Sequence, residues 1–259
     1  MDATRRVLVL GATGRTGGRV VTQLLDRGVA VRAIVRSADR LPAGSIEHAL
    51  LEVVEADLLT LSTADLVHHL DGCDAVISCL GHTISVRGVL GPPHDLVRHA
   101  LSQVRAAIEA SPPPAPVRLI LMGSVSVNQP KRADSRRGAG QRALLRGLRL
   151  VLPPSRDNQR AADLLANEVG PADPHLHWVV VRPDTLKEGD VGEYVVHDAI
   201  VSSLFRPDHT RMANLAHFMC ELVTDDTTWE RWRSRMPVVV DAEPAEEKAS
   251  QLSGKGSAS

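Results

Sequence analysis

Aromatic residues are scarce in this chain of 259 residues, and tyrosine occurs only once, at Tyr194. Phe, Trp and Tyr together make up 2% of the sequence. A composition so poor in rings argues mildly against a binding site built on ring stacking. A single tyrosine also restricts every mechanism that needs a phenol group to one position in the chain.

Cysteine is equally rare, with three residues, Cys73, Cys79 and Cys220. Their number is odd, and their spacing matches neither a C-x-x-C motif nor a metal site. Cys73 and Cys79 flank or lie within an apolar run, which favours buried small hydrophobic residues over a disulfide framework. We therefore expect no bound metal and a reducing compartment, which fits a cytoplasmic protein.

The chain also lacks an excess of charge and any long apolar run. Its net charge is −1, so no global electrostatic attraction to nucleic acid or to an anionic membrane is expected. No segment approaches the roughly 20 apolar residues that a membrane span needs. Residues 1–6 are polar, and the apolar run that follows ends at Gly11, so we expect neither a secretory signal nor a membrane anchor.

The first half of the chain alternates between strand and helix patterns. Apolar runs separated by amphipathic segments and glycines predict parallel strands joined by helices, a Rossmann-type, doubly wound α/β fold. Gly28 stands where a glycine commonly ends a helix. The strands are expected at 7–10, 29–35, 51–54, 74–80 and 117–122, and the helices at 15–26, 63–70 and 94–110.

The second half is less regular. A basic, helix-prone segment at about 128–154 predicts a helical, lid-like insertion into one domain that spans residues 1–241. From residue 242 the composition of Glu, Ala, Ser and Gly predicts a disordered tail to residue 259. The insertion carries an apolar stripe of Leu144, Leu145, Leu148 and Val151. Further elements are expected as helices at 157–169 and 212–223 and strands at 177–181 and 237–240.

A glycine-rich turn lies between the first strand and the first helix. Glycine is needed there because the chain turns sharply and its backbone must approach a pyrophosphate with no Cβ in the way. The N–H groups of the helix then face the phosphate. The turn reads Gly11-Ala12-Thr13-Gly14-Arg15-Thr16-Gly17, and we expect all of it except Ala12 to contact a dinucleotide.

This G-A-T-G-x-T-G sequence resembles the opening of the extended and atypical short-chain dehydrogenase/reductases. The similarity extends over about residues 5–240 and includes the helix at 214–219, which resembles that of biliverdin reductase B and its NAD(P)H-binding relatives. The resemblance assigns further cofactor contacts beyond the turn. These are Asp57 and Leu58 after the third strand, Cys79, Leu80 and Gly81 after the fourth, and Pro183 after the sixth.

Arg36 ends the second strand, where an acidic residue would bind the adenosine ribose of NAD. No carboxylate follows until Asp39. An arginine at this position can stack on adenine and pair with a 2′-phosphate. The sequence therefore predicts NADPH as the cofactor, with Arg15 as a further contact.

The standard reaction of the family uses a Tyr-x-x-x-Lys pair, which this chain lacks. Tyr194 lies beyond the sixth strand and is followed four residues later by Asp198, which should raise the phenol pKa. Arg156 and Arg160 have the same four-residue spacing on the expected helix, but an arginine is a poor proton donor. Arg160 is expected to hold ribose hydroxyl groups instead.

Three side chains are candidates to replace the missing tyrosine. Ser124, where the family places its active-site serine, could bind a substrate oxygen, although a strand-end hydroxyl bonded to backbone is an equal alternative. His82 could act as a general acid near neutral pH, or be a solvated loop residue. Asp184 could orient a substrate hydroxyl or cap a turn. A substrate phenol beside the ketone could also supply the proton.

The resulting hypothesis is an NADPH-dependent ketoreductase acting on an apolar aromatic or polycyclic small molecule. The arginine-rich, lysine-poor composition and the insertion resemble atypical reductases of actinobacterial antibiotic biosynthesis, such as the angucyclinone ketoreductases of the simocyclinone type. Two alternatives remain: a non-catalytic NADP-binding regulator, and a flavin or tetrapyrrole reductase. The substrate and the oligomeric state do not follow from the sequence.

Overall fold

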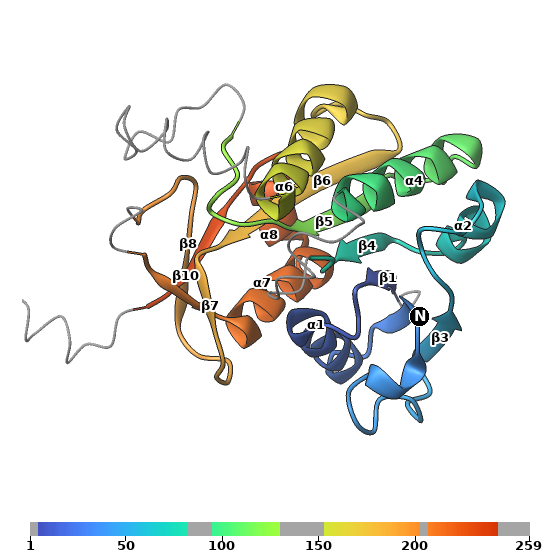
Figure 1. The fold of residues 1–259 in the computed structure, drawn as a ribbon, viewed down its shortest axis with the longest axis horizontal. Helices are drawn as coiled ribbons and strands as arrows, with labels where there is room; N and C mark the ends of the chain where they lie inside the picture. The colour runs from blue at the N-terminus through green and yellow to red at the C-terminus, as the bar shows by residue number, and fades with distance from the viewer. Residues whose placement is uncertain (1–4, 82–94, 130–152, 203–206, 243–259) are drawn as a thin grey trace, which may run out of the picture.

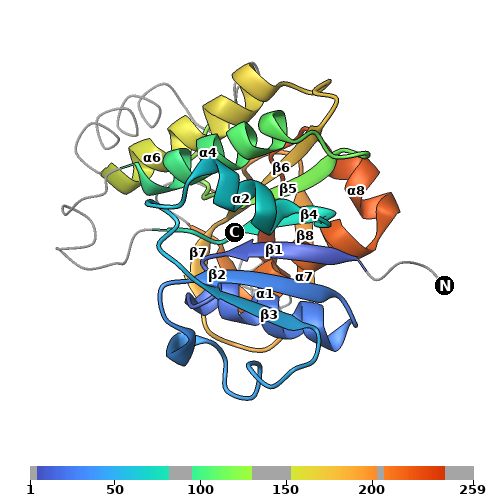
Figure 2. The same cartoon turned by 90° about the vertical axis from the view of Figure 1, so that its right-hand side faces the viewer.

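Continuous apolar segments form the centre of a parallel sheet in the computed structural model, which describes residues 5–81, 95–129, 153–202 and 207–242. The central strands are β1 (Arg6–Leu10), β4 (Ala75–Ser78), β5 (Val117–Met122) and β6 (Leu176–Pro183). Their apolar side chains are almost all buried, because helices cover both faces of the sheet (Figures 1 and 2).

The sheet has eight strands in the order β3-β2-β1-β4-β5-β6-β10-β8. The remaining strands are β2 (Ala30–Val35), β3 (Leu51–Glu55), β8 (Tyr194–His197) and β10 (Val238–Asp241). All neighbours pair in parallel except β8, which runs antiparallel to β10. The strand order reverses direction between β1 and β4, and ligands of doubly wound folds bind at the carboxyl edge of such a switch point.

The helices form two layers. On one face α1 (Arg15–Asp26) packs against α7 (Met212–Thr224), and α8 (Asp226–Trp232) follows. On the other face α4 (Leu96–Ala110) lies between α2 (Thr63–Leu70) and α6 (Pro153–Asp163) (Figure 2). Within α1, the residues spaced at 3 or 4 positions are the buried ones, and the helix ends before Gly28, whose φ is +72°.

The expected doubly wound α/β fold is confirmed, and the bounds of α1, α2 and β5 agree with the expected ones to the residue. The helix expected at 157–169 instead begins at Pro153, because proline is tolerated in the first turn, and continues as the π-helix η2 (Leu164–Val169). Most of the expected insertion (130–152) and the tail from residue 243 lie outside the described residues.

Elements not expected from the sequence include α8, β8 and the short parallel pair β7 (Thr185–Lys187) and β9 (His209–Arg211). All three cysteines are buried, Cys79 and Cys220 in the core on the α1–α7 face and Cys73 in the core on the other face. In the described part of the chain, no helix is long and apolar enough to cross a membrane. The same residues contain no cluster of His, Cys, Asp and Glu able to hold a metal.

Candidate dinucleotide site

The glycine turn connects the carboxyl end of β1 to α1 at the switch point. Gly11 has a φ of +77°, and its carbonyl accepts a hydrogen bond of 3.0 Å from the backbone N–H of Gly14. A Cβ on Gly11 would lie 2.8 Å from the carbonyl carbon of Cys79, and one on Gly17 would lie 2.1 Å from the carbonyl oxygen of Gly11. The turn therefore requires glycine at both positions and packs directly against the end of β4.

The amino terminus of α1 is left open for an anion. Gly14 is the N-cap, no side chain caps the helix, and the first turn contains no acidic residue. Gly14 and Arg15 are exposed, whereas Thr16 is buried and Thr13 half-buried. A Cβ on Gly14 would have the Gly11 carbonyl oxygen, at 3.2 Å, as its only neighbour within 4 Å. Because Gly14 has no side chain, the approach to the positive end of the helix dipole stays free.

Arg36 follows β2 at the same edge of the sheet and is exposed. Within the described ranges no carboxylate forms an ion pair with it. Glu55 ends the neighbouring strand opposite Val35, but its carboxylate accepts a 2.6 Å hydrogen bond from the backbone N–H of Ala38. The Glu55 carboxylate thus holds the backbone after Arg36.

A groove of about 540 Å³ runs from the glycine turn along the outer side of α1. Arg40, in the 3₁₀-helix η1 (Ala38–Arg40), lines it together with Gly14 and Arg15. Sequence reasoning stopped at Arg36 and missed Arg40. The signal that could have found it was a second arginine four residues further along, on a segment that returns toward α1.

The residues after β3 and β4 lie at the same carboxyl edge as the turn. Asp57 is exposed, and its Oδ1 accepts a 3.0 Å hydrogen bond from the N–H of Leu59, which fixes this corner, while Leu58 is buried. The Cys79 N–H donates to the carbonyl of Leu10 at 2.9 Å, so it continues the β1–β4 ladder. Leu80 is half-buried and Gly81 is exposed. His82 lies outside the described residues.

Ser124 follows β5 and closes a turn. Its Oγ accepts a 3.1 Å hydrogen bond from the N–H of Ser126, which is the backbone role that the sequence left open. The next residue, Val125, donates its N–H to the carbonyl of Pro183 at 3.0 Å, so the ends of β5 and β6 are joined. Asp184 accepts from the N–H of Thr185 at 2.8 Å and from the Ser202 hydroxyl, as a turn-capping residue does.

Helix α6 presents Arg156 and Arg160 as exposed side chains and buries Asp157 between them. The Asp157 carboxylate accepts hydrogen bonds from the N–H groups of Val97 at 2.8 Å and Arg98 at 3.0 Å. It therefore caps α4, whose own N-cap residue, Asp95, makes no side-chain cap bond. Sequence reasoning missed this contact because its partners lie about 60 residues away.

Tyr194 lies on the edge strand β8, among residues of α7. Its hydroxyl is 2.9 Å from Nδ1 of His217 and 2.5 Å from a carboxylate oxygen of Glu221. Burial, and next the hydrogen bond to Glu221, raise the pKa of Tyr194 well above its usual value. The expectation that Asp198 raises this pKa was wrong, since Asp198 pairs instead with Arg235 at 3.0 Å.

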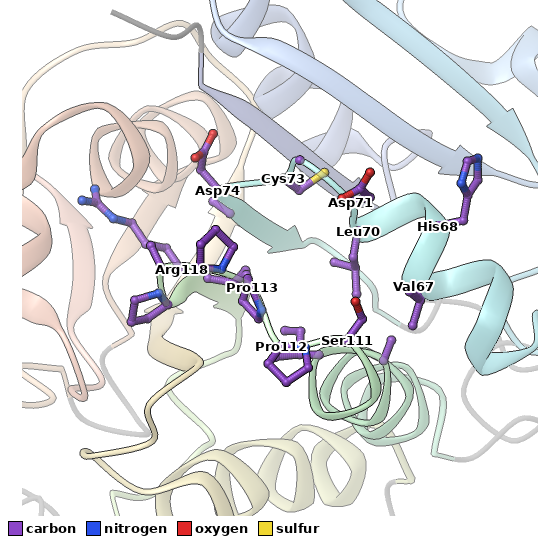
Figure 3. Close-up of a pocket in the computed structure, with 18 of the residues that line it drawn as sticks. Val67, His68, Leu70, Asp71, Cys73, Asp74, Ser111, Pro112, Pro113 and Arg118 are labelled. Atoms are coloured by element: carbon purple, nitrogen blue, oxygen red, sulfur yellow. The ribbon is translucent and has the colours of Figure 1, made fainter.

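A second cavity, of about 660 Å³, lies at the opposite edge of the sheet. Its lining comes from the starts of β4 and β5, the ends of α2 and α4, and the loop at 111–116 (Figure 3). Asp74 and Arg118 mark the two strand starts in Figure 3. Because the glycine turn follows the carboxyl end of β1, this cavity lies at the other end of the strands from the dinucleotide site.

Comparison with known sequences agrees with this geometry. A family model described as NAD(P)H-binding matches residues 11–226. An uncharacterized chloroplastic protein of Arabidopsis thaliana is 46% identical over 55 residues, which are 21% of this chain and 20% of that protein. A 3 beta-hydroxysteroid dehydrogenase/Delta 5→4-isomerase of Mycobacterium tuberculosis is 36% identical over 86 residues, which are 33% of this chain and 20% of that enzyme. The chain thus matches about a fifth of the length of these curated relatives.

Solved structures share the whole fold at low identity. An oxidoreductase, ylbE, from Lactococcus lactis has a TM-score of 0.64 at 18% identity and covers 95% of both chains. A wide-type short-chain dehydrogenase/reductase from Veillonella parvula, in complex with NADP, has a TM-score of 0.64 at 14% identity and covers 94% of this chain and 96% of that one. A candidate NADH-flavin reductase from Streptococcus pneumoniae has a TM-score of 0.62 at 17% identity, and the match covers 92% of this chain and 100% of that one.

Proposed function

Because the chain belongs to the NAD(P)H-binding family, we propose that it is an NADPH-dependent reductase that transfers a hydride to a carbonyl group of an aromatic or polycyclic substrate. One observation carries this proposal above the others. The glycine turn leaves the amino terminus of α1 uncapped and free of acidic residues, which is the arrangement that a pyrophosphate requires. The turn also depends on glycine, since a side chain at Gly11 or Gly17 would collide with the backbone.

The choice of NADPH over NADH rests on Arg36. This guanidinium is exposed at the end of β2, and the nearby Glu55 carboxylate is engaged by the Ala38 N–H. A 2′-phosphate at this corner would meet one arginine directly and the groove-lining side chains of Arg15 and Arg40 beside it. An acidic residue in the place of Arg36 would favour NADH instead.

NADPH supplies the hydride when it is bound, and this chain's own residues position the reactants. The turn would hold the phosphates through backbone N–H groups, and the residues after β4, β5 and β6 would border the substrate. Ser124 accepts one backbone hydrogen bond at its Oγ, which leaves its hydroxyl hydrogen available for a substrate oxygen. Positioning by such groups can supply a large part of a rate enhancement without a tyrosine.

The absence of a Tyr-Lys pair suits a substrate that carries its own proton donor, such as a phenol beside the ketone. This favours polyketide-type substrates of the kind found in antibiotic biosynthesis. His82 remains a proposed general acid, and Arg160 a proposed ligand of the ribose hydroxyl groups. Three free, buried thiols fit a cytoplasmic protein.

Two alternatives have specific support. The Tyr194 hydroxyl is bonded to His217 and Glu221, which leaves the chain without a family-type proton donor and favours a non-catalytic NADP-binding regulator. The likeness in fold to a candidate NADH-flavin reductase favours a flavin as the electron acceptor. Both alternatives retain the same cofactor site.

The decisive experiment measures binding and turnover separately. Titration with NADPH and NADH, followed by fluorescence, tests the cofactor, and NADPH consumption at 340 nm is then screened with quinones, flavins and polycyclic ketones. Consumption with a polycyclic ketone supports the proposal, and consumption with flavins alone supports a flavin reductase. Tight binding with no consumption by any acceptor supports a regulator.

A further inference from the structure

Glu188 lies immediately after β7 and reaches across to the first turn of α1. Its carboxylate pairs with the guanidinium of Arg19 and lies 3.7 Å from Nη1 of Arg15. Arg19 in turn donates a 2.7 Å hydrogen bond to the carbonyl of Arg15. One exposed carboxylate is therefore shared by the two arginines that begin the helix of the glycine turn.

The position of Glu188 is set by the backbone around it. Its strand, β7, pairs in parallel with β9, and the register places Lys187 opposite Arg211. The following residue, Gly189, has a φ of +137°, and a Cβ there would lie 2.8 Å from Cδ of Arg211. A φ of this size is rarely adopted by residues other than glycine, so the turn that follows Glu188 is built around Gly189.

Arg15 is at the same time part of the groove that leads from the glycine turn to Arg40. The charged side chains facing this groove are Arg15, Arg19, Arg40 and Asp190, and Glu188 adjoins them through its two ion pairs. A 2′-phosphate bound near Arg36 and this groove would attract the Arg15 guanidinium, which the Glu188 carboxylate also attracts. The phosphate and the carboxylate thus compete for one guanidinium.

The geometry points to Glu188 as a residue that sets the cofactor specificity of the site, by pairing with Arg15 in competition with the 2′-phosphate and so lowering the affinity for NADPH relative to NADH. This inference rests on the proposed NADPH site. Exposed ion pairs of this kind are weak, so the carboxylate attenuates NADPH binding without preventing it. The affinity of the natural protein for NADPH then reflects attraction by Arg15, Arg36 and Arg40 and the opposing effect of the Glu188 carboxylate.

The test compares two variants. Glu188→Gln keeps the side-chain shape and removes the charge, and Glu193→Gln changes an exposed glutamate on the same segment that forms no ion pair with the described residues. Dissociation constants are measured for NADPH, NADH and adenosine 2′,5′-bisphosphate at low ionic strength. Glu188→Gln should tighten NADPH and the bisphosphate on the order of two- to fivefold and change NADH by less than twofold. Glu193→Gln should change none of them.

A second pair of variants shows whether Arg15 carries the effect. In an Arg15→Ala background, Glu188→Gln should no longer change the affinity for NADPH. Unchanged NADPH affinity in Glu188→Gln, or an equal gain for NADPH and NADH, would overturn the inference while leaving the proposed cofactor intact. If the wild-type protein binds NADH but not NADPH, the proposed cofactor choice fails first, and that result is seen before any variant is made.

Discussion

The hydroxyl group of Tyr194 lies 2.5 Å from a carboxylate oxygen of Glu221, on the face of α7 that meets the edge strand β8. The same hydroxyl contacts His217, one turn earlier on the helix. The only phenol of the chain is therefore part of a Tyr-His-Glu network that joins the edge strand β8 to α7. Its raised pKa and its partners indicate a structural role.

Tyr194→Phe should leave most of the reductase activity and destabilise the protein by about 1 kcal/mol, because it removes one hydrogen-bonding hydroxyl group. Turnover and thermal unfolding of the variant are compared with those of the wild type. General acid catalysis contributes roughly 10²–10⁴-fold. A loss of that size in kcat, with NADPH affinity and Tm unchanged, would make Tyr194 the proton donor.

Arg36→Ala should weaken NADPH binding by about tenfold or more and leave NADH binding nearly unchanged, since a charge-assisted bond to a 2′-phosphate is worth about 1.5–3 kcal/mol. Fluorescence titration of both cofactors measures the effect. Arg231→Ala, which removes an exposed arginine on α8, is the matched control. Equal losses for NADPH and NADH would contradict the assignment of Arg36.

Gly14→Val should abolish dinucleotide binding and leave the fold largely intact. The φ of −80° at Gly14 suits a side chain, and a Cβ would press only on the Gly11 carbonyl, at 3.2 Å. The branched side chain would, however, occupy the approach to the helix amino terminus. Circular dichroism checks the fold, and a folded variant with wild-type NADPH affinity would show that phosphate binds elsewhere.

Asp157→Ala should destabilise the protein by about 2 kcal/mol or more, because the buried N–H of Val97 and the partly buried N–H of Arg98 lose a charged acceptor. Asp95→Ala is the matched control. Asp95 stands at the N-cap of the same helix but makes no cap bond, so its removal should cost less than about 0.5 kcal/mol. Urea unfolding of both variants decides whether the cap of α4 comes from its own sequence or from α6.

The protein should lose stability as the pH falls through about 6.5. Burial, and then Arg27, lower the pKa of His217, and burial also lowers the pKa values of His69 and His177. A histidine with a lowered folded pKa binds more protons in the unfolded state, so acid favours unfolding. Asp65, Asp225 and Asp226, whose pKa values are lowered, lose their contribution only nearer pH 4.

Thermal unfolding between about pH 8 and 5 measures this dependence. His217→Asn should reduce the slope, since it removes one of the three groups. A melting temperature that stays constant, or rises, as the pH falls through this range would contradict the prediction.

The sequence predicts the α/β framework well because its signals are local. The apolar residues of α1 recur at helical spacing and end at Gly28, and the strand runs end at glycine or a turn. The short elements after Pro183 could not be predicted in the same way. Strands β7 and β9 have three residues each, and each forms only because the other lies beside it.

The candidate site likewise contains residues that local sequence predicts and residues that it does not. The glycines and Arg36 are read from position in the motif, and the structure places them together at one edge of the sheet. Asp157 and Glu188 act on partners that are about 60 and more than 160 residues away, so no pattern near them indicates their role. The role of a charged residue whose partner is distant in the sequence can be assigned only when the fold is known.

The burial of all three cysteines has a practical consequence for following the unfolding of this protein. Burial raises the pKa of Cys73 to about 11 and that of Cys220 to about 12, so very little reactive thiolate exists at neutral pH in the folded state. A thiol reagent would therefore label these positions chiefly when the chain opens. Because Cys73 lies on one side of the sheet and Cys79 and Cys220 on the other, mass spectrometry of the labelled peptides would report the opening of each helical layer separately. The natural sequence thus contains its own built-in probes of local unfolding.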